Sequence, residues 1–378
     1  MMGYIEAPPG LENVAVASTA ITYIEGGNDQ ICYRGYDVKE LARSSTYEEV
    51  AFLLLRGRLP LEHELKDFSD MLRSCRPLSP LHRSFLRSLP SEMEVIDSLA
   101  ATLLLPAEKT KGHPSVHGPN YDLGCQIIAE TPTIFAAAHR LHLGLEPLEP
   151  RPDLGHAANF LYMIRGEVPS PVESRAFDAV MILHADNELN TSTFAARVAA
   201  STRADMPSAI VAALSTLKGP LHGGASMHVI RQLDEIGEPS RVEEYVKERF
   251  DSGQRVTGFG HRVYKVEDPR ATVLRELARD LSKAKGDSTR FEMLLRLERA
   301  VKEKKSLPVN IDLYSSCVYS QLQIPLELFI PIFAASRTVG WTAHIREEYA
   351  AGKLISPVAI YNGNRNLKYV KLSERTSA

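Results

Sequence analysis

Apolar residues recur at the spacing of an α-helix along most of the chain. After Asp268 and Pro269, four apolar positions repeat at i, i+3, i+4 and i+7, namely Leu274, Leu277, Ala278 and Leu281. After residue 60, Leu65, Phe68 and Leu72 share one helical face in the same way. A stripe with this period is the face that an amphipathic helix buries. The pattern predicts a protein built mainly from helices.

Capping residues mark the ends of two of these helices. The run Ser45–Glu49 places hydroxyl side chains before glutamates, and Gly57 follows the last apolar residue of the segment. Ser170, Pro171 and Glu173 have the order of a capping box with proline at the first helical position. Both segments are therefore predicted to be helices with well-defined starts.

The beginning of the chain departs from the helical pattern. Two β-prone runs, AITYIE and QICY, flank the turn-forming sequence GGND at residues 26–29. Glycine, asparagine and aspartate between two such runs are typical of a β-hairpin. We therefore predict an all-α fold that carries one short N-terminal β-hairpin.

Composition limits the classes of partner. Basic and acidic residues number 44 and 47, are mixed throughout, and give a formal net charge of -3, so we expect no nucleic-acid partner and no membrane partner. The strongest uncharged apolar run, Leu99–Ala107, is too short to cross a bilayer, and the first residues are not expected to form a secretory leader. The cysteines are widely spaced, at Cys32, Cys75, Cys125 and Cys317. We expect a cytoplasmic protein with neither disulfides nor a zinc site.

One segment, residues 108–122, combines lysines, glycines, prolines and histidines and is predicted to be a long loop. His113 and His117 lie within it. Without a third ligand nearby they are interpreted as solvated loop residues, and no metal is expected.

Three stretches combine an ionisable side chain with an exposed backbone. They are LKGPLHGGA around His222, GFGHRVYK around His261 and VNIDLYSS around Asp312. Glycines beside a histidine allow a ligand to approach the main chain closely. Each stretch alone is a weak signal of function.

Together the three stretches match a known family. The segments YRGYDVKELA, ILHADNELNTSTFAARVAAST, LKGPLHGGA, GFGHRVYKVEDPRA, VNIDLYS and FAASRTVGWTAHI, in this order, resemble the citrate synthases. The resemblance covers about residues 10 to 370, and it extends to the related 2-methylcitrate synthases. It implies a two-domain helical homodimer with a large domain at residues 1–221 and 319–378. A small domain at residues 222–318 would close over the active site.

The implied reaction joins an acyl-CoA, such as acetyl-CoA, to a 2-oxo acid, such as oxaloacetate, with no cofactor. By this resemblance Asp312 is the base that removes a proton from the thioester. His222 donates a hydrogen bond to the thioester oxygen, which is worth on the order of 3 kcal/mol for a well-placed donor. His261 assists at the keto oxygen of the second substrate.

The same resemblance assigns residues that bind the substrates. Arg270 and Arg337 match carboxylate-binding arginines, whose planar guanidinium grips a carboxylate with two hydrogen bonds. His184 and Asn187 lie in the motif that contacts the 2-oxo acid. The candidates for binding the phosphates of CoA are Arg262, Lys265 and Lys305.

Two positions depart from the family pattern. Asn187 stands where the family commonly has a histidine, and Ser356 stands where it has an arginine that reaches the partner subunit's site and binds a carboxylate. Serine supplies no charge, so recognition of a second carboxylate is in doubt unless Lys353 or Arg346 compensates. A different 2-oxo acid is the resulting alternative.

Two other classes of protein remain open. Two histidines and a carboxylate are also the ligands of non-haem iron sites, which metal analysis of the purified protein would reveal. A non-catalytic relative that only binds CoA or a protein is the second alternative. The presence of Asp312, His222 and His261 together argues against it.

Overall fold

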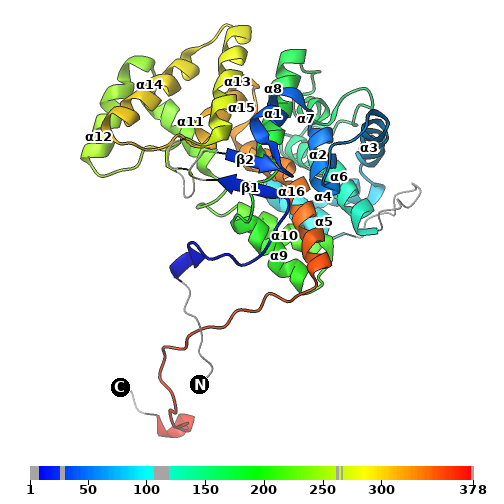
Figure 1. Cartoon of the computed structure of the whole chain (residues 1–378), viewed down its shortest axis with the longest axis vertical. Coiled ribbons are helices and arrows are strands. Elements are labelled where there is room, and N and C mark those ends of the chain that lie inside the picture. Colours follow the sequence, from blue (N-terminus) through cyan, green and yellow to red (C-terminus); the bar gives the residue numbers. More distant parts are fainter. Residues whose placement is uncertain (1–7, 26–29, 106–118, 261–263, 265–266, 376–378) are drawn as a thin grey trace.

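The computed structural model of the chain describes residues 8–25, 30–105, 119–260, 264 and 267–375 (Figure 1). Over these residues it contains sixteen α-helices. They are α1 (Val38–Ser44), α2 (Tyr47–Arg56), α3 (Glu62–Cys75), α4 (Pro80–Ser88), α5 (Val95–Leu103), α6 (Pro119–His142), α7 (His156–Arg165), α8 (Pro171–His184), α9 (Thr191–Ser201), α10 (Met206–Leu217), α11 (Ala225–Ile236), α12 (Val242–Asp251), α13 (Pro269–Lys285), α14 (Thr289–Lys304), α15 (Ile311–Gln321) and α16 (Phe329–Ala351). The prediction of an all-α fold is confirmed.

The predicted hairpin is present. Strands β1 (Thr22–Glu25) and β2 (Gln30–Tyr33) pair antiparallel, with Tyr23 opposite Cys32. A third short strand, β3 (Tyr36–Asp37), extends the sheet from β2. The predicted turn at residues 26–29 lies outside the described residues.

The predicted caps begin their helices as expected. Thr46 accepts a hydrogen bond from the backbone of Glu49 at the start of α2, and Gly57 ends that helix in the left-handed conformation. Ser170 and Glu173 form the predicted capping box of α8. These short-range contacts arise from neighbouring residues, which is why the sequence predicts them well.

The predicted loop at residues 108–122 is partly wrong. Helix α6 already begins at Pro119, so the last four residues of that segment are helical. Proline is favoured in the first turn of a helix because its missing N–H needs no partner there. Residues 106–118, which include His113 and His117, lie outside the described part of the chain.

Helix α16 lies at the centre of the molecule (Figure 1) and packs against α6, α8, α9 and α10. It is buried on nearly every side between Phe329 and Ile345, and Trp341 is fully buried. A helix that is buried on nearly every side is a core helix. It therefore holds the side chains that project from it in fixed positions.

Helices α11 to α14 gather on one side of the molecule, and α15 joins them to the core (Figure 1). Helix α13 packs on α15 and also on α1 and α8. The expected boundary between a small and a large domain, after residue 318, falls within α15. The division into two domains stays a prediction.

All four cysteines are free and buried. Among the described residues no helix is long and apolar enough to cross a membrane.

Candidate functional site

The predicted site residues come from the ends of three helices, the middle of a fourth helix and one loop. His184 is the last residue of α8, Arg270 lies in the first turn of α13, and Asp312 lies in the first turn of α15. Arg337 projects from the middle of α16, and His222 lies in the loop between α10 and α11. The fold thus joins side chains that are up to 153 residues apart in sequence.

Phe333 connects three members of this group. Its ring lies edge-on to the rings of His184 and His222, with centroids 5.0 and 6.3 Å apart. The guanidinium of Arg337, one turn later on α16, lies 4.8 Å from the same centroid. An aromatic face attracts a cation at this distance. Phe333 therefore packs against both histidines and against Arg337.

The loop that carries His222 is tightly constrained. The backbone N–H of His222 donates to Gly219, and that of Gly223 donates to Leu217. A Cβ at position 223 would lie 2.6 Å from the Leu217 carbonyl oxygen, so glycine is required for this approach. The glycines that flank the histidine in the sequence thus fix the position of its ring.

A serine holds the ring of His222. Its Nε2 lies 2.9 Å from Oγ of Ser192, which also accepts a hydrogen bond of 3.2 Å from the indole N–H of Trp341. The serine proton is then free for Nε2 of His222 or for Oδ1 of Asn190, 2.8 Å away. When it is given to Nε2, the imidazole carries its own proton on Nδ1 and can donate it to a substrate oxygen.

Burial keeps His222 neutral. Desolvation, with a smaller effect from the charge of Arg337, lowers its pKa to about 4. A neutral imidazole can still donate one hydrogen bond. It can therefore polarise a carbonyl oxygen without carrying a charge itself.

The pKa of Asp312 is shifted in the opposite direction, upward. Burial raises its pKa to about 6, the nearby Arg270 lowers it and Asp268 raises it. Its backbone N–H is bound by Oδ1 of Asn310, the residue that caps α15. A carboxylate with this raised pKa is a stronger base than an ordinary one and is still ionised at neutral pH.

Arg270 is buried and already paired. Two of its nitrogens donate to the carboxylate of Asp268, at 2.9 and 2.8 Å, and both side chains are at most 3% exposed. Asp268 also accepts from the backbone N–H of Arg270 at the start of α13. The pair adds little net charge, and Asp268 holds the guanidinium in one orientation.

Arg337 is as deeply buried, at 1% exposed, but no carboxylate of the described residues lies within 4.0 Å of its guanidinium. Its Nε donates to the backbone carbonyl of His184 at 2.7 Å. Burial lowers its pKa to about 10, which leaves it charged at neutral pH. A buried cation without an ion pair is costly, and a bound anion would remove that cost.

His184 is also neutral. Burial lowers its pKa to about 3, and its Nδ1 lies 2.9 Å from the carbonyl oxygen of Val180. A carbonyl only accepts, so Nδ1 carries the proton and Nε2 is left as an acceptor. His184 therefore fits a hydroxyl or a water better than a carboxylate.

Asn187 lies in the turn between α8 and α9. The residue before it, Asp186, takes part in a buried hydrogen-bond network. Asp186 is fully buried and accepts from Thr22, and it lies 3.2 Å from Nε2 of His344. A Cβ at Gly340 would lie 2.4 Å from Oδ1 of Asp186, so α16 approaches this turn at a glycine. Oδ1 of Asn187 is itself buried and has no partner among the described residues.

The other candidate residues lie outside this group. Ser356 and Lys353 are in the chain that follows α16, where Lys353 is exposed. Arg346 donates to the Leu55 carbonyl and lies over the ring of Tyr121. The ammonium of Lys305 lies 4.4 Å from the ring centroid of Phe250.

His261, Arg262 and Lys265 lie outside the described residues. Both ends of their segment are attached to the strand-like residues that precede α15. Gly260 donates to the Pro308 carbonyl at 2.7 Å, and Asp268 donates to that of Val309 at 2.9 Å. Gly260 and Asp268 are therefore held beside residues 308 and 309, which lie a few positions before Asp312 in the sequence.

Sequence reasoning missed the residues that support the site. Ser192 and Trp341 lie within the family motifs, but spacing alone does not show that they meet around His222. Asp268 was recognised only as the start of a helix, and Phe333 carried no signal. These contacts join distant segments, so only the fold reveals them.

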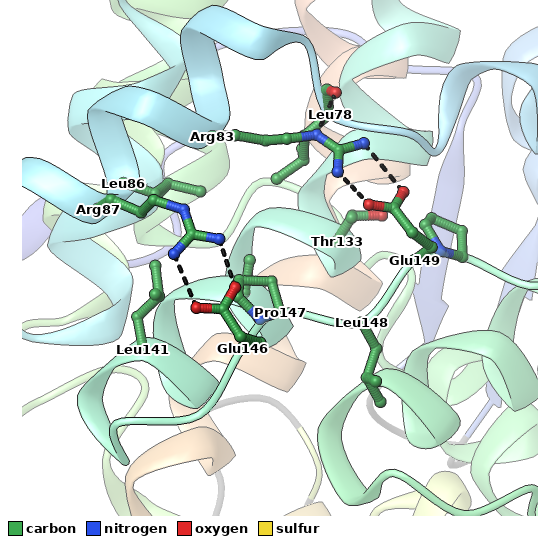
Figure 2. A pocket seen from close by; sticks show the side chains of 12 residues that line it. Leu78, Arg83, Leu86, Arg87, Thr133, Leu141, Glu146, Pro147, Leu148 and Glu149 are labelled. Carbon is green, nitrogen blue, oxygen red and sulfur yellow. Dashed lines mark hydrogen bonds and ion pairs between the residues drawn. The ribbon is translucent and has the colours of Figure 1, made fainter.

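A small pocket elsewhere is not this site. It has a volume of about 140 Å³ and lies between α4 and the chain after α6 (Figure 2). Arg83 pairs with Glu149 and Arg87 with Glu146 across its rim. None of the predicted site residues lines it. Within the described residues, no group of three or more histidine, cysteine or acidic side chains is arranged to hold a metal ion.

Comparison with known proteins decides the family. The family model described as citrate synthase, C-terminal domain, matches residues 10–358. The chain belongs to the citrate synthase family. It is therefore a transferase, and the resemblance found in its motifs is confirmed.

The similarity extends over nearly the whole chain. The citrate synthase of Haloferax volcanii is 40% identical over 98% of this chain and 99% of its own. Citrate synthase 2 of Bacillus subtilis is 41% identical over 98% and 99%. The crystal structure of citrate synthase from Pyrobaculum aerophilum, 39% identical, superimposes with a TM-score of 0.90 over 99% of this chain and 98% of that one.

Proposed function

We propose that this member of the citrate synthase family condenses acetyl-CoA with oxaloacetate, or with a closely related 2-oxo acid, to give citrate or its analogue and CoA. The observation that carries the proposal is Arg337, a buried cation with no carboxylate partner in the described part of the chain, beside two neutral histidines. Such a cation can form an ion pair with the carboxylate of a 2-oxo acid. Asp312, whose pKa is raised, supplies the base.

In the first step Asp312 removes one proton from the methyl group next to the thioester carbonyl. The electron pair of the broken C–H bond moves toward the carbonyl oxygen and forms an enolate or enol. His222, oriented by Ser192, donates its hydrogen bond to that oxygen as the negative charge develops there. A donor aimed at the developing charge stabilises the transition state more than the ground state.

In the second step the enol carbon attacks the keto carbon of the 2-oxo acid. The keto oxygen takes up a proton and becomes a hydroxyl, a step to which the resemblance assigns His261. Arg337, and the donors of Arg270 not used by Asp268, hold the 2-oxo acid in place. Water then cleaves the thioester, which releases the carboxylic acid and CoA thiol. The proposal requires no metal or prosthetic group.

A matrix of acyl-CoAs and 2-oxo acids tests the proposal directly. Release of free CoA thiol is measured for acetyl-CoA and propionyl-CoA, each with oxaloacetate and with 2-oxo acids that lack the second carboxylate. We expect the fastest release with acetyl-CoA and a dicarboxylic 2-oxo acid. Faster release with propionyl-CoA would indicate a 2-methylcitrate synthase, and no release with any pair would refute the proposal.

The serine beside His222 gives a first prediction. Ser192→Ala removes the partner of Nε2, and we expect kcat to fall by about three- to tenfold, the value of one hydrogen bond of about 1 kcal/mol. The KM for the 2-oxo acid should stay within about twofold. Ser201→Ala on the same helix is the matched control and should leave kcat unchanged. Equal losses in both variants would show a general structural effect.

The raised pKa of Asp312 predicts the pH dependence. Asp312 must be ionised to accept a proton, so activity is present above its pKa of about 6 and is lost as the pH falls through that value. The expected result is a tenfold fall in kcat/KM for each pH unit well below 6. A midpoint near 4, the ordinary value for aspartate, would contradict the desolvated environment of this carboxyl group.

The departures at Asn187 and Ser356 predict a weakened affinity for oxaloacetate. A carboxylate without its charged partner loses about 2–5 kcal/mol, or roughly thirty- to several-thousand-fold in affinity. The double variant Asn187→His, Ser356→Arg should lower the KM for oxaloacetate and reduce activity with 2-oxo acids that lack or reposition the second carboxylate. A micromolar KM in the parent and no gain in the variant would show that other residues compensate.

A homodimer is part of this proposal. The chain after α16 runs away from the body in extended form (Figure 1) and exposes large apolar side chains, namely Leu354, Val358, Ile360, Tyr361, Leu367, Tyr369 and Leu372. Exposed apolar side chains in this number are typical of a contact surface. Sedimentation at several concentrations tests for a dimer. The cytoplasmic location stays a prediction.

A further inference from the structure

A second cavity lies among the N-terminal halves of three helices. It has a volume of about 470 Å³, is open to solvent, and is lined by residues from the starts of α2, α7 and α8 and from α3. This size is in the range of small-molecule sites. None of the residues assigned to the proposed reaction lines it.

A buried histidine of this cavity has no hydrogen-bond partner for its ring among the described residues. His156 lines the cavity, is 2% exposed, and both of its ring nitrogens are left without such a partner. Burial, and then the charge of Arg76, lowers its pKa to about 3, so the ring is neutral. Buried polar atoms are nearly always satisfied in native proteins, and each exception calls for an explanation.

One side of the cavity favours a cation. The carboxylates of Glu48 and Asp178 both line it. Burial, and then the charge of Glu48, raises the pKa of Asp178 to about 7, although Arg175 lies 3.4 Å from it. A positively charged group placed here would reduce the repulsion between the two carboxylates.

The other side favours an anion. Arg73 lines the cavity; one end of its guanidinium pairs with Asp70 at 2.5 Å, and its Nε is buried without a hydrogen-bond partner among the described residues. The first turn of α7 also faces the cavity. The amide of His156 there donates to Glu48, but the cap residue Gly155 has no side chain to accept from the amides that follow. The N-terminus of a helix attracts negative charge.

Tyr47 links this cavity to the proposed active site. Its ring stacks on His156 with centroids 5.0 Å apart, and its backbone N–H donates to Asp178 at 3.0 Å. Its hydroxyl donates to the carbonyl of Ser336 at 3.1 Å, directly before Arg337. A ligand that moves His156 or Asp178 therefore acts on a side chain that supports the backbone of Arg337.

We propose that this cavity binds a small zwitterion, an α-amino acid with a short aliphatic side chain, and that Tyr47 transmits its binding to Arg337. The ammonium group contacts Asp178, and the carboxylate contacts Arg73 and the first turn of α7. The aliphatic part contacts the apolar side chains of the lining, which come from α3 and α7. The transmission to Arg337 rests on the proposed function, whereas the binding site does not.

Three matched probes test the binding. L-Norvaline carries both charges, pentanoate lacks its ammonium group and butylamine lacks its carboxylate. In calorimetric titrations of the full chain we expect norvaline to bind at least about tenfold more tightly than either half, because each charge has its own partner. No saturable binding of norvaline, or binding no tighter than that of the halves, would overturn the proposal.

Two variants and one control variant separate the binding of norvaline from its transmission to Arg337. Ala158→Leu fills the cavity and should abolish norvaline binding, whereas Ala284→Leu at an exposed position of α13 should preserve it. In the parent, norvaline should change the KM for the 2-oxo acid by about fivefold or more. Tyr47→Phe should keep the binding and lose this change in KM.

Each outcome tests either the binding site or the transmission through Tyr47. Norvaline binding that survives Ala158→Leu would place the ligand elsewhere and overturn the site. Binding that leaves the KM of the parent unchanged would overturn the transmission through Tyr47. If the chain proved unable to condense the two substrates, calorimetry would still decide the site by itself.

Discussion

Replacing Asp312 with asparagine is expected to reduce the exchange of the acyl-CoA α-protons with solvent by about 10²- to 10⁴-fold, the usual contribution of a positioned base. Asparagine keeps the shape of the side chain and removes its ability to accept a proton. The affinity for the acyl-CoA should change by no more than about twofold, because the proposed role of Asp312 begins only when the C–H bond breaks. Exchange is measured by NMR in deuterated water.

The control for this variant is Asp280→Asn, at an exposed aspartate of α13 that pairs with Arg279. It should exchange the α-protons at the parent rate. Exchange at the parent rate in Asp312→Asn itself would remove Asp312 as the base. Loss of exchange together with loss of acyl-CoA binding would show that the substitution disrupts the site as a whole.

Replacing Arg337 with glutamine is expected to raise the KM for the 2-oxo acid by roughly thirty- to several-thousand-fold. The variant leaves the substrate carboxylate without its buried cation, which costs about 2–5 kcal/mol. Arg337→Lys should recover part of this loss, because lysine restores the charge without the two-pronged geometry. Steady-state kinetics at saturating acyl-CoA measure both effects.

Arg346→Gln on the same helix is the control, because Arg346 contacts Leu55 and Tyr121. Its KM for the 2-oxo acid should stay close to that of the parent. A similar rise in both variants would indicate that α16 is disturbed in general. An unchanged KM in Arg337→Gln would show that the carboxylate binds elsewhere.

The sequence predicts the parts of this protein that depend on neighbouring residues. Thr46 and Ser170 start their helices as expected, and the β-hairpin follows from the glycine-rich turn between two β-prone runs. Each of these features is decided within a few residues, so it can be predicted without knowledge of the fold. Pro119 shows the limit, because a proline interpreted as part of a loop is instead the first residue of α6.

The identities of the site residues follow from motifs, but their properties do not. Asp312 would be a weak base in water, and only its burial beside Arg270 and Asp268 gives it a pKa of about 6. The motifs assign Arg270 and Arg337 the same role in binding a carboxylate. In the fold, Arg270 is paired with Asp268, whereas Arg337 has no carboxylate partner among the described residues. These differences arise from contacts between distant segments.

Conversion of trideuterated acetyl-CoA with oxaloacetate tests the proposed reaction most directly. Removal of one deuteron by Asp312, followed by attack of the enol carbon on the keto carbon, predicts citrate with two deuterons in one methylene group, detected by mass spectrometry. The parent protein should form this product, and Asp312→Asn should not. Absence of any condensation product from the parent, with no more free CoA than in Asp312→Asn, would contradict the reaction proposed for this chain.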